Sequence, residues 1–220
     1  MAKITFGILA LNAQPLLEYN LRALYPYAHQ ILVVEGATRP AASLSVGGHS
    51  SDDTVKMLAT FKKKKDPEGK LQVVTAAEDG YADGLWPEKD EMSQAFAKRA
   101  DGDWLWQVDS DEFYKAQDME AVMRLLDERP NISRISFPFY EFWGGFDYFT
   151  TGTWYLHEFT EVRRIFRWRS GYSYSSHRPP TVLNETGHEL DGPRWITGGQ
   201  MRKRGIFMYH YSYVFPKQAQ

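Results

Sequence analysis

Three carboxylates follow an apolar run near the middle of this 220-residue chain. Residues 104–108 are apolar except for one Gln, and Asp109, Asp111 and Glu112 come directly after them. Carboxylate oxygens are ligands that Mg²⁺ and Mn²⁺ prefer, and Mg²⁺ commonly shares its coordination with phosphate oxygens. The run therefore indicates a divalent-cation site at the end of a strand. A polar turn ahead of a helix that begins near Asp118 is the alternative, because an isolated D-x-D motif is a weak signal.

The elements around this run would position the carboxylates. Short apolar runs alternate with helix-length amphipathic stretches through the first half of the chain, which is the pattern of crossover units on a parallel sheet. We expect strands at 4–11, 31–34, 71–75 and 104–108, and helices at 16–24, 53–61 and 89–100. The sequence thus predicts an α/β fold with a mainly parallel central sheet flanked by helices.

Polar residues follow three of these strands. Asn12 follows the first, Glu35 the second and Asp109 the fourth. Open parallel sheets bind ligands at the carboxyl ends of their strands, so one crevice could hold all three side chains. Such a crevice suits a nucleoside diphosphate: Glu35 or Asp53 would accept a base N–H, Asn12 would bond base or ribose, and a metal at Asp111 would bridge the phosphates. Ordinary loop hydrogen bonds, and helix capping for Asp53, are the alternatives.

The second half of the chain is rich in aromatic residues. They crowd residues 137–149, and strand-like runs follow at 162–168 and 206–213. Sugars pack their C–H faces on aromatic rings, so we expect Trp143, Tyr148 and Trp154 to bind an acceptor, with Phe146 also exposed. Core packing of a strand at 135–139 is the alternative for the first part of the run. His177 is placed with the acceptor residues, although it could instead bind phosphate or hold the following turn.

Three arginines lie in the run 162–168. Arg163, Arg164 and Arg167 alternate imperfectly with apolar neighbours. This spacing favours a solvated strand face over contacts with carboxylates or with a diphosphate.

Composition narrows the class of protein. Hydrophobic residues make up 43% and charged residues 25% of the chain, an ordinary globular balance. A formal net charge of −2 gives no general attraction to nucleic acid, so no nucleic-acid partner is expected. The absence of cysteine excludes disulfides and a thiol nucleophile. Without a signal-peptide pattern or an apolar run of membrane-spanning length, we expect a cytoplasmic protein with no transmembrane segment.

The order of these segments resembles the family 2 glycosyltransferases of GT-A fold. The resemblance rests on residues 4–12, 31–36, 51–54, Lys89 and 102–112, and it is looser after residue 115. It implies one GT-A-like domain over 1–220, with a Rossmann-like nucleotide-sugar-binding half at about 1–115 and a mixed-sheet acceptor half at about 116–220. It also implies transfer of a sugar from a nucleotide sugar, commonly a UDP-sugar, to an acceptor hydroxyl, with inversion and with Mn²⁺ or Mg²⁺ as cofactor.

The resemblance further implies roles for single residues. The implied donor-binding residues are Asn12, Glu35, Asp53, Lys89, Asp109 and Ser110, and the implied metal ligands are Asp109, Asp111 and His210. Neutral imidazole is a common metal ligand. A packed core position for His210 and a solvated helix face for Lys89 are the alternatives.

An inverting displacement needs one base within reach of the attacking hydroxyl. The Glu-Asp pair that often marks this base in the family is absent after the sheet. Glu185, in a polar loop, is the first candidate, Glu141, in the aromatic segment, is the second, and Glu161 and Asp191 also remain. An exposed loop charge is the alternative for Glu185.

Two other classes of protein fit parts of this pattern. A nucleotidyltransferase could use the same metal and crevice, although no Gly-rich, Arg-containing loop follows the first strand. A non-catalytic carbohydrate-binding module would keep the aromatic platform without a metal-dependent nucleotide site. Metal-dependent nucleotide binding separates the module from both enzymes, and hydrolysis of a nucleotide sugar separates the transferase from the nucleotidyltransferase.

Overall fold

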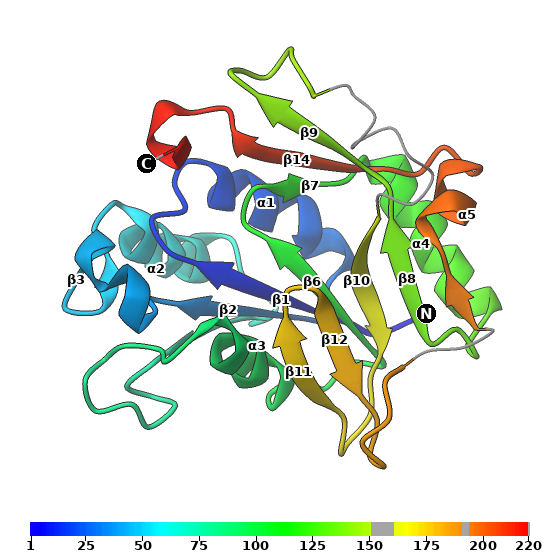
Figure 1. Ribbon diagram of the computed structural model, residues 1–220, viewed down its shortest axis with the longest axis horizontal. Helices are drawn as coiled ribbons and strands as arrows, with labels where there is room; N and C mark the ends of the chain where they lie inside the picture. Colours follow the sequence, from blue (N-terminus) through cyan, green and yellow to red (C-terminus); the bar gives the residue numbers. More distant parts are fainter. Residues whose placement is uncertain (151–160, 191–193, 220) are drawn as a thin grey trace.

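A seven-stranded, mostly parallel sheet forms the centre of the molecule, in the order β13-β8-β10-β6-β1-β2-β5 (Figure 1). The computed structural model describes residues 1–150, 161–190 and 194–219. The parallel strands of the first half are β1 (Ile4–Ala10), β2 (Gln30–Glu35), β5 (Leu71–Thr75) and β6 (Trp104–Asp109). The helices that connect them are α1 (Leu16–Leu24), α2 (Thr54–Lys64) and α3 (Lys89–Ala97). All seven predicted elements are thus confirmed, with ends that differ by a few residues.

The second half adds mixed strands to the same sheet. β10 (Val162–Arg167) runs antiparallel to both β6 and β8 (Arg134–Phe137), and β13 (Trp195–Ile196) pairs parallel with β8. Between β10 and β13, β11 (Ser173–His177) and β12 (Pro180–Leu183) form a hairpin. The remaining helices of the described chain are α4 (Ala116–Glu128) and α5 (Gly198–Arg202). The α/β class with a mainly parallel sheet is confirmed, and the single-domain organisation stays a prediction.

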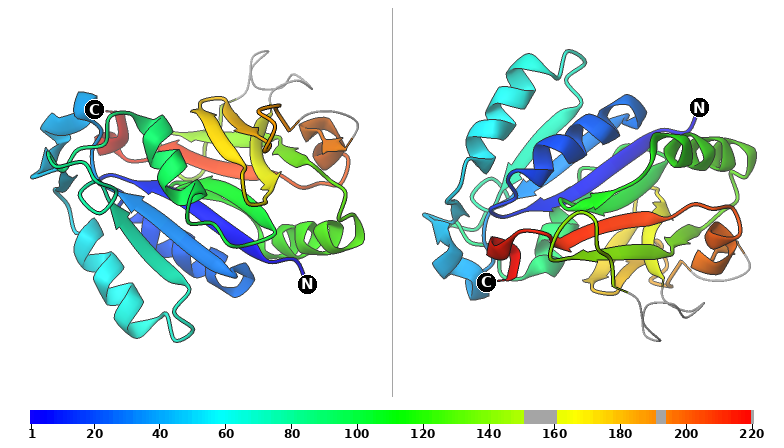
Figure 2. Two further views of the ribbon diagram at one scale, coloured as in Figure 1. Left: turned by 90° about the horizontal axis from the view of Figure 1, so that it is seen from below. Right: turned by 90° about the horizontal axis from the view of Figure 1, so that it is seen from above.

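The central sheet is covered on both faces. Successive side chains of a strand point to opposite faces, so Ile31 and Val33 pack with α1, α2 and α4, whereas Leu32 and Val34 pack with α3 and the β11–β12 hairpin. Figure 2 shows the cyan α2 and green α4 on the side of the sheet opposite the yellow hairpin. A strand buried on both faces must be apolar at every position, which explains the run Ile-Leu-Val-Val in β2.

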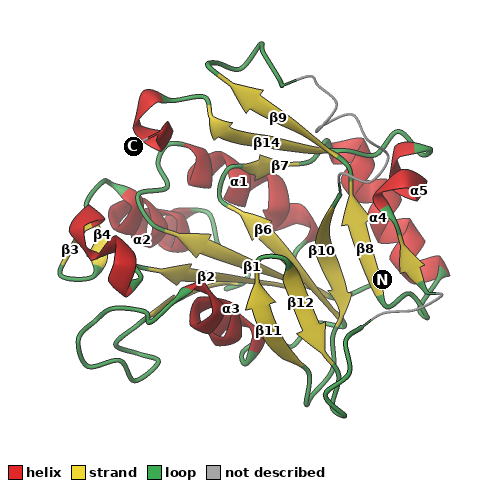
Figure 3. Ribbon diagram, in the orientation of Figure 1, coloured by secondary structure: helices red, strands yellow, loops and turns green. Residues whose placement is uncertain are grey.

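A second, three-stranded sheet lies beside the carboxyl end of β6 (Figure 3). Its order is β7 (Glu112–Phe113), β14 (Met208–Tyr213) and β9 (Phe139–Trp143). The strand expected at 135–139 is in fact divided between β8 and β9 at Pro138, since proline has no N–H to continue a ladder. The chain therefore leaves the main sheet at Pro138 and enters the small one.

Within the described residues, no helix combines the length and the apolar character needed to cross a membrane.

Candidate metal and nucleotide site

The acidic run lies where β6 leaves the main sheet. Asp109 is the last residue of β6, and Ser110 and Asp111 form the turn that leads into β7. The Asp109 amide donates to Glu112 Oε2 over 3.1 Å, which holds this turn closed. The three predicted carboxylates are therefore held at the carboxyl edge of the sheet by local geometry.

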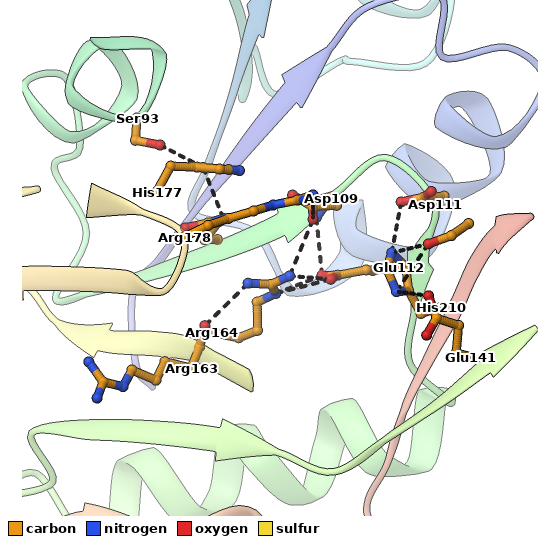
Figure 4. A network of polar contacts seen from close by, with 12 residues as sticks. Ser93, Asp109, Asp111, Glu112, Glu141, Arg163, Arg164, His177, Arg178 and His210 are labelled. Carbon is orange, nitrogen blue, oxygen red and sulfur yellow. Dashed lines mark hydrogen bonds and ion pairs between the residues drawn. The ribbon is translucent and has the colours of Figure 1, made fainter. Parts of the chain in front are cut away.

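The small sheet places three ionisable residues side by side. His210 on β14 lies opposite Glu112 on β7 and opposite Glu141 on β9. His210 Nε2 is 3.5 Å from Asp111 Oδ1, and its Nδ1 is 3.8 Å from Glu141 Oε1 (Figure 4). The Ser212 hydroxyl also lies 2.7 Å from Nε2. The structure thus brings His210 to Asp111 and into one group with Asp109, and a metal held by these three residues stays a prediction.

Arg164 neutralises the most buried carboxylate. Its Nε lies 2.8 and 3.1 Å from the two oxygens of Glu112, which is fully buried, and Nη2 bonds Glu112 and lies 3.3 Å from Asp109. Burial raises the pKa of Glu112, and the guanidinium opposes that rise; the two-pronged geometry is that of an ionised pair. Arg164 therefore holds Glu112 in place.

The expectation of a solvated face for Arg164 is wrong. Arg164 is only 5% exposed. The pairing of β10 with β8 shifts register between Arg163 and Ile165, so the simple alternation of faces along the strand is broken at this residue. The bulge allows Arg164 to reach the acidic cluster, and no feature of the sequence indicates where this bulge lies.

The charge on His210 depends on its acidic neighbours. Burial opposes protonation of the ring, but the hydrogen bond to Asp111 and the charges of Glu112, Asp111 and Asp109 raise the pKa of His210 to about 9. For Asp109, burial would raise the pKa, but Arg164 and other positive groups lower it below its usual value. The cluster is thus an environment that favours positive charge.

The donor set fits a divalent cation. Ligand atoms of Asp109, Glu112 and His210 lie within 4.8 Å of one another. Both oxygens of Glu112 bond Arg164, whereas only Oδ2 of Asp109 does, and Glu141 lies at Nδ1 of His210. The carboxylates left for a cation at His210 Nε2 are therefore those of Asp109 and Asp111. Two carboxylates and an imidazole suit Mn²⁺, which accepts both oxygen and nitrogen ligands.

His177 is a buried residue on the other side of Asp109. Its Nδ1 lies 2.9 Å from Ser93 Oγ and 3.3 Å from Gln107 Nε2, and its amide donates to Asp90 Oδ1. Burial, followed by the nearby cations Lys89 and Arg178, lowers the pKa of His177 to about 4, although Asp109 opposes the shift. The ring is therefore neutral at pH 7.

This buried histidine makes stability depend on pH. Between its unfolded pKa near 6.5 and its folded pKa near 4, only the unfolded chain takes up the proton. We expect His177 to lower the free energy of unfolding by about 2–3 kcal/mol as pH falls from 7 to 4.5. In urea unfolding, the free energy of unfolding of His177→Gln should fall by about 2–3 kcal/mol less than that of wild type between pH 7 and pH 4.5. His188→Gln, at an exposed histidine, should keep the wild-type difference, and equal pH profiles for all three proteins would contradict the assignment.

Asn12 and Glu35 both hold the loop at residues 44–52. Asn12 Oδ1 accepts from the Ser51 amide over 2.7 Å, and its Nδ2 donates to Leu44 O. Glu35 is 2% exposed; it accepts from the Ser50 amide and contacts His49 Nδ1, both over 2.7 Å. Both side chains therefore make the loop hydrogen bonds that were the alternative to nucleoside binding. A nucleoside contact by either side chain stays a prediction, and His49 is the half-exposed group at this edge.

Two other predicted donor residues, Asp53 and Lys89, lie outside this loop. The Asp53 side chain is exposed, and its Oδ1 lies 3.7 Å from Lys56 Nζ. With Glu18 and Lys65, Asp53 lines a cavity of about 310 Å³ between α1 and α2. The structure therefore does not bring Asp53 to Asn12; Asp52 contacts that loop instead, through the Gln14 amide. Lys89 is exposed at the start of α3 and close enough to affect His177.

The two base candidates are separated. Glu141 lies in the acidic cluster beside His210. Glu185 follows β12 at the Ser173 end of the hairpin, roughly 13 Å of strand away from His177. Glu161 accepts a hydrogen bond from the Gly198 amide at the start of α5. Asp191 lies outside the described residues.

An exposed aromatic surface begins two residues beyond Glu141. Trp143 is 56% and Tyr148 71% exposed, and Phe146 is also exposed, as predicted. The Trp143 ring packs on Tyr213 with centroids 4.3 Å apart. Trp154 lies outside the described residues. An exposed, tilted pair of rings two residues beyond Glu141 offers apolar faces on which a sugar can pack.

Comparisons with known proteins give likenesses among solved structures only. No family model and no curated protein matches the sequence. S. aureus TarS, residues 1–349, is 14% identical, with a TM-score of 0.49 over 75% of this chain and 47% of that one. The Pyrobaculum calidifontis mannosyltransferase PcManGT, in complex with GDP-Man and Mn²⁺, is 18% identical, with a TM-score of 0.47 over 62% and 35%.

The Mycobacterium tuberculosis glucosyl-3-phosphoglycerate synthase, in complex with Mn²⁺, UDP and glucosyl-3-phosphoglycerate, is 17% identical, with a TM-score of 0.41. The match covers 64% of this chain and 44% of that one. In all three cases this chain spans less than half of the matched chain. These values are too low to assign a family or an activity, so the function must be inferred from the chain's own residues.

Proposed function

We propose that this chain is a metal-dependent enzyme that binds a nucleoside diphosphate at the carboxyl edge of its sheet. More specifically, we propose a glycosyltransferase that moves a sugar from a nucleotide sugar, with a UDP-sugar favoured, to an acceptor hydroxyl with inversion. The observation that carries the proposal is the meeting of Asp109, Asp111 and His210 at the end of β6, beside the loops that follow β1 and β2.

Each residue of the cluster has a distinct role in this proposal. Asp109, Asp111 and His210 Nε2 would hold Mn²⁺ or Mg²⁺, and Glu141 would orient His210 through Nδ1, as carboxylates commonly do for metal-bound histidines. Arg164 keeps Glu112 paired and limits the negative charge beside the ligands. A divalent cation bound there would stabilise the charge that develops on a departing diphosphate.

The acceptor is the less defined substrate. The exposed rings of Trp143 and Tyr148 support a carbohydrate acceptor or another hydroxyl-bearing molecule with a flat apolar face. A carbohydrate-binding module would use the same rings, but it has no need of the acidic cluster. Of the base candidates, Glu141 is within reach of the cluster and Glu185 is not, so Glu185 would require a different acceptor position.

Release of nucleoside diphosphate from nucleotide sugars tests the proposal. With Mn²⁺, we expect the protein to hydrolyse one of UDP-glucose, UDP-GlcNAc, GDP-mannose and dTDP-glucose slowly, because water can replace the acceptor. EDTA and Asp111→Asn should abolish the release. Pyrophosphate formation from a nucleoside triphosphate and a sugar phosphate would indicate a nucleotidyltransferase instead, and the absence of both reactions would favour a binding module.

A further inference from the structure

One ring nitrogen of His177 has no protein partner in the described part of the chain. Nδ1 is occupied by Ser93 and Gln107, whereas Nε2 makes no hydrogen bond to residues 1–150, 161–190 or 194–219. The residue is only 3% exposed. Nε2 is not one of the fully buried, unpartnered side-chain atoms of the described residues, so this nitrogen is open to solvent and can donate to a ligand or a water.

The contacts of His177 fix where its proton lies. The Tyr174 hydroxyl donates to Gln107 Oε1 over 2.9 Å, which turns the Gln107 NH₂ group toward His177 Nδ1. An amide NH₂ can only donate, so Nδ1 is the acceptor and the proton of the neutral ring is on Nε2. His177 therefore presents a fixed N–H donor, not a base.

Three positive charges, those of Lys89, Arg178 and Arg164, act on this donor together with the opposing carboxylate of Asp109. In Figure 4 the unpartnered nitrogen lies on the side of the ring that faces Asp109. Arg178 directly follows His177; its side chain is 70% exposed and its Nη2 is 3.9 Å from Asp109 Oδ2. Lys89 and Arg178 both act electrostatically on His177. The His177 N–H and the Arg178 guanidinium thus lie beside Asp109, on the side away from His210, and the Lys89 ammonium is close enough to act on His177.

We propose that His177 Nε2–H, Arg178 and Lys89 bind the terminal phosphate of a diphosphate ligand. The inference rests on the proposed function, because it takes the diphosphate from the nucleotide-sugar donor. Phosphate oxygens accept charge-assisted hydrogen bonds, and a diphosphate that bridges from the cation to this group would meet positive charge at both ends. His177 then belongs to the donor site, in place of the acceptor site predicted from the sequence.

Paired titrations of a nucleoside diphosphate and its monophosphate test the proposal. The probe is whichever of UDP, GDP, dTDP and CDP binds wild type most tightly in Mn²⁺. His177→Leu should weaken its binding about 10-fold or more while changing monophosphate binding less than about twofold. His177→Gln, which keeps an N–H near the position of Nε2, should restore most of the difference. Arg178→Ala, at a side chain that is 70% exposed, should weaken the binding of the diphosphate alone by up to about fivefold.

Three results would overturn the inference. They are equal losses for diphosphate and monophosphate in His177→Leu, no loss in either His177→Leu or Arg178→Ala, and a ¹⁵N spectrum that places the His177 proton on Nδ1. If wild type binds no nucleotide, the proposed function fails, and inorganic pyrophosphate with Mn²⁺ replaces the nucleotide in the same titrations. Pyrophosphate binding weakened by His177→Leu would then support the phosphate site, and no pyrophosphate binding would refute it.

Discussion

Arg164→Leu is expected to lower the free energy of unfolding by about 3–5 kcal/mol, because it leaves a buried carboxylate without its counter-charge. Glu112 is fully buried, and Arg164 bonds both of its oxygens. Asp109, whose Oδ2 lies 3.3 Å from Arg164 Nη2, loses its nearest guanidinium as well. Urea unfolding at pH 7 measures the loss.

Two variants separate this charge effect from simple loss of a side chain. Arg163→Leu, on the same strand, should cost much less, because Arg163 is partly exposed and its partner Glu189 still bonds Arg134. Glu112→Leu combined with Arg164→Leu should recover a large part of the loss, since an apolar pair leaves no unpaired charge between these two positions. Equal costs for Arg163→Leu and Arg164→Leu would contradict the ion-pair account.

Asp111→Asn is expected to weaken Mn²⁺ binding by about 100-fold or more, because it removes one of two carboxylates available to the cation. His210→Ala should have a comparable effect, and Glu141→Gln should weaken binding about 10-fold through the orientation of His210. Glu185→Gln serves as the matched control, since this glutamate lies at the far end of the hairpin. Calorimetric titration of Mn²⁺ into each protein gives the affinities.

The same titration should be sensitive to pH. His210 must lose its proton to bind a metal, and its pKa in the metal-free protein is about 9. Below that pH each unit of acidification should weaken Mn²⁺ binding about 10-fold, and close to one proton should be released per ion at pH 7.5. Mn²⁺ affinity that is unchanged in Asp111→Asn and independent of pH would place the ion elsewhere.

Local sequence signals predicted the first half of the fold well. The apolar strands and the polar residues after three of them can be read directly from the sequence, and the carboxyl ends of parallel strands lie at the same edge of a sheet. The acidic run after β6 was therefore accessible before the structure, whereas the proximity of His210 was implied only by the resemblance to GT-A glycosyltransferases. Asp53 shows the limit of this approach, because neighbouring aspartates at a helix start cannot be told apart by type, and Asp52 contacts the β1 loop instead.

Contacts that depend on register were not accessible from the sequence. Glu112 and Arg164 are 52 residues apart, and a bulge in β10 determines where Arg164 lies. Glu141 and His210 meet because β9 and β14 pair in one register, and a shift of one residue would turn either side chain to the opposite face. Similarly, the proton position on His177 follows from Gln107 and Tyr174, which come from separate elements.

The most direct measurement is a calorimetric titration of UDP, GDP, dTDP and CDP into the protein with Mn²⁺, with EDTA, and with Asp111→Asn. A metal-bridged diphosphate site predicts that one nucleotide binds in Mn²⁺ and that both EDTA and the substitution abolish this binding. Failure of all four nucleotides to bind in Mn²⁺, or binding that EDTA and Asp111→Asn leave unchanged, would contradict a metal-dependent nucleotide site at the end of β6.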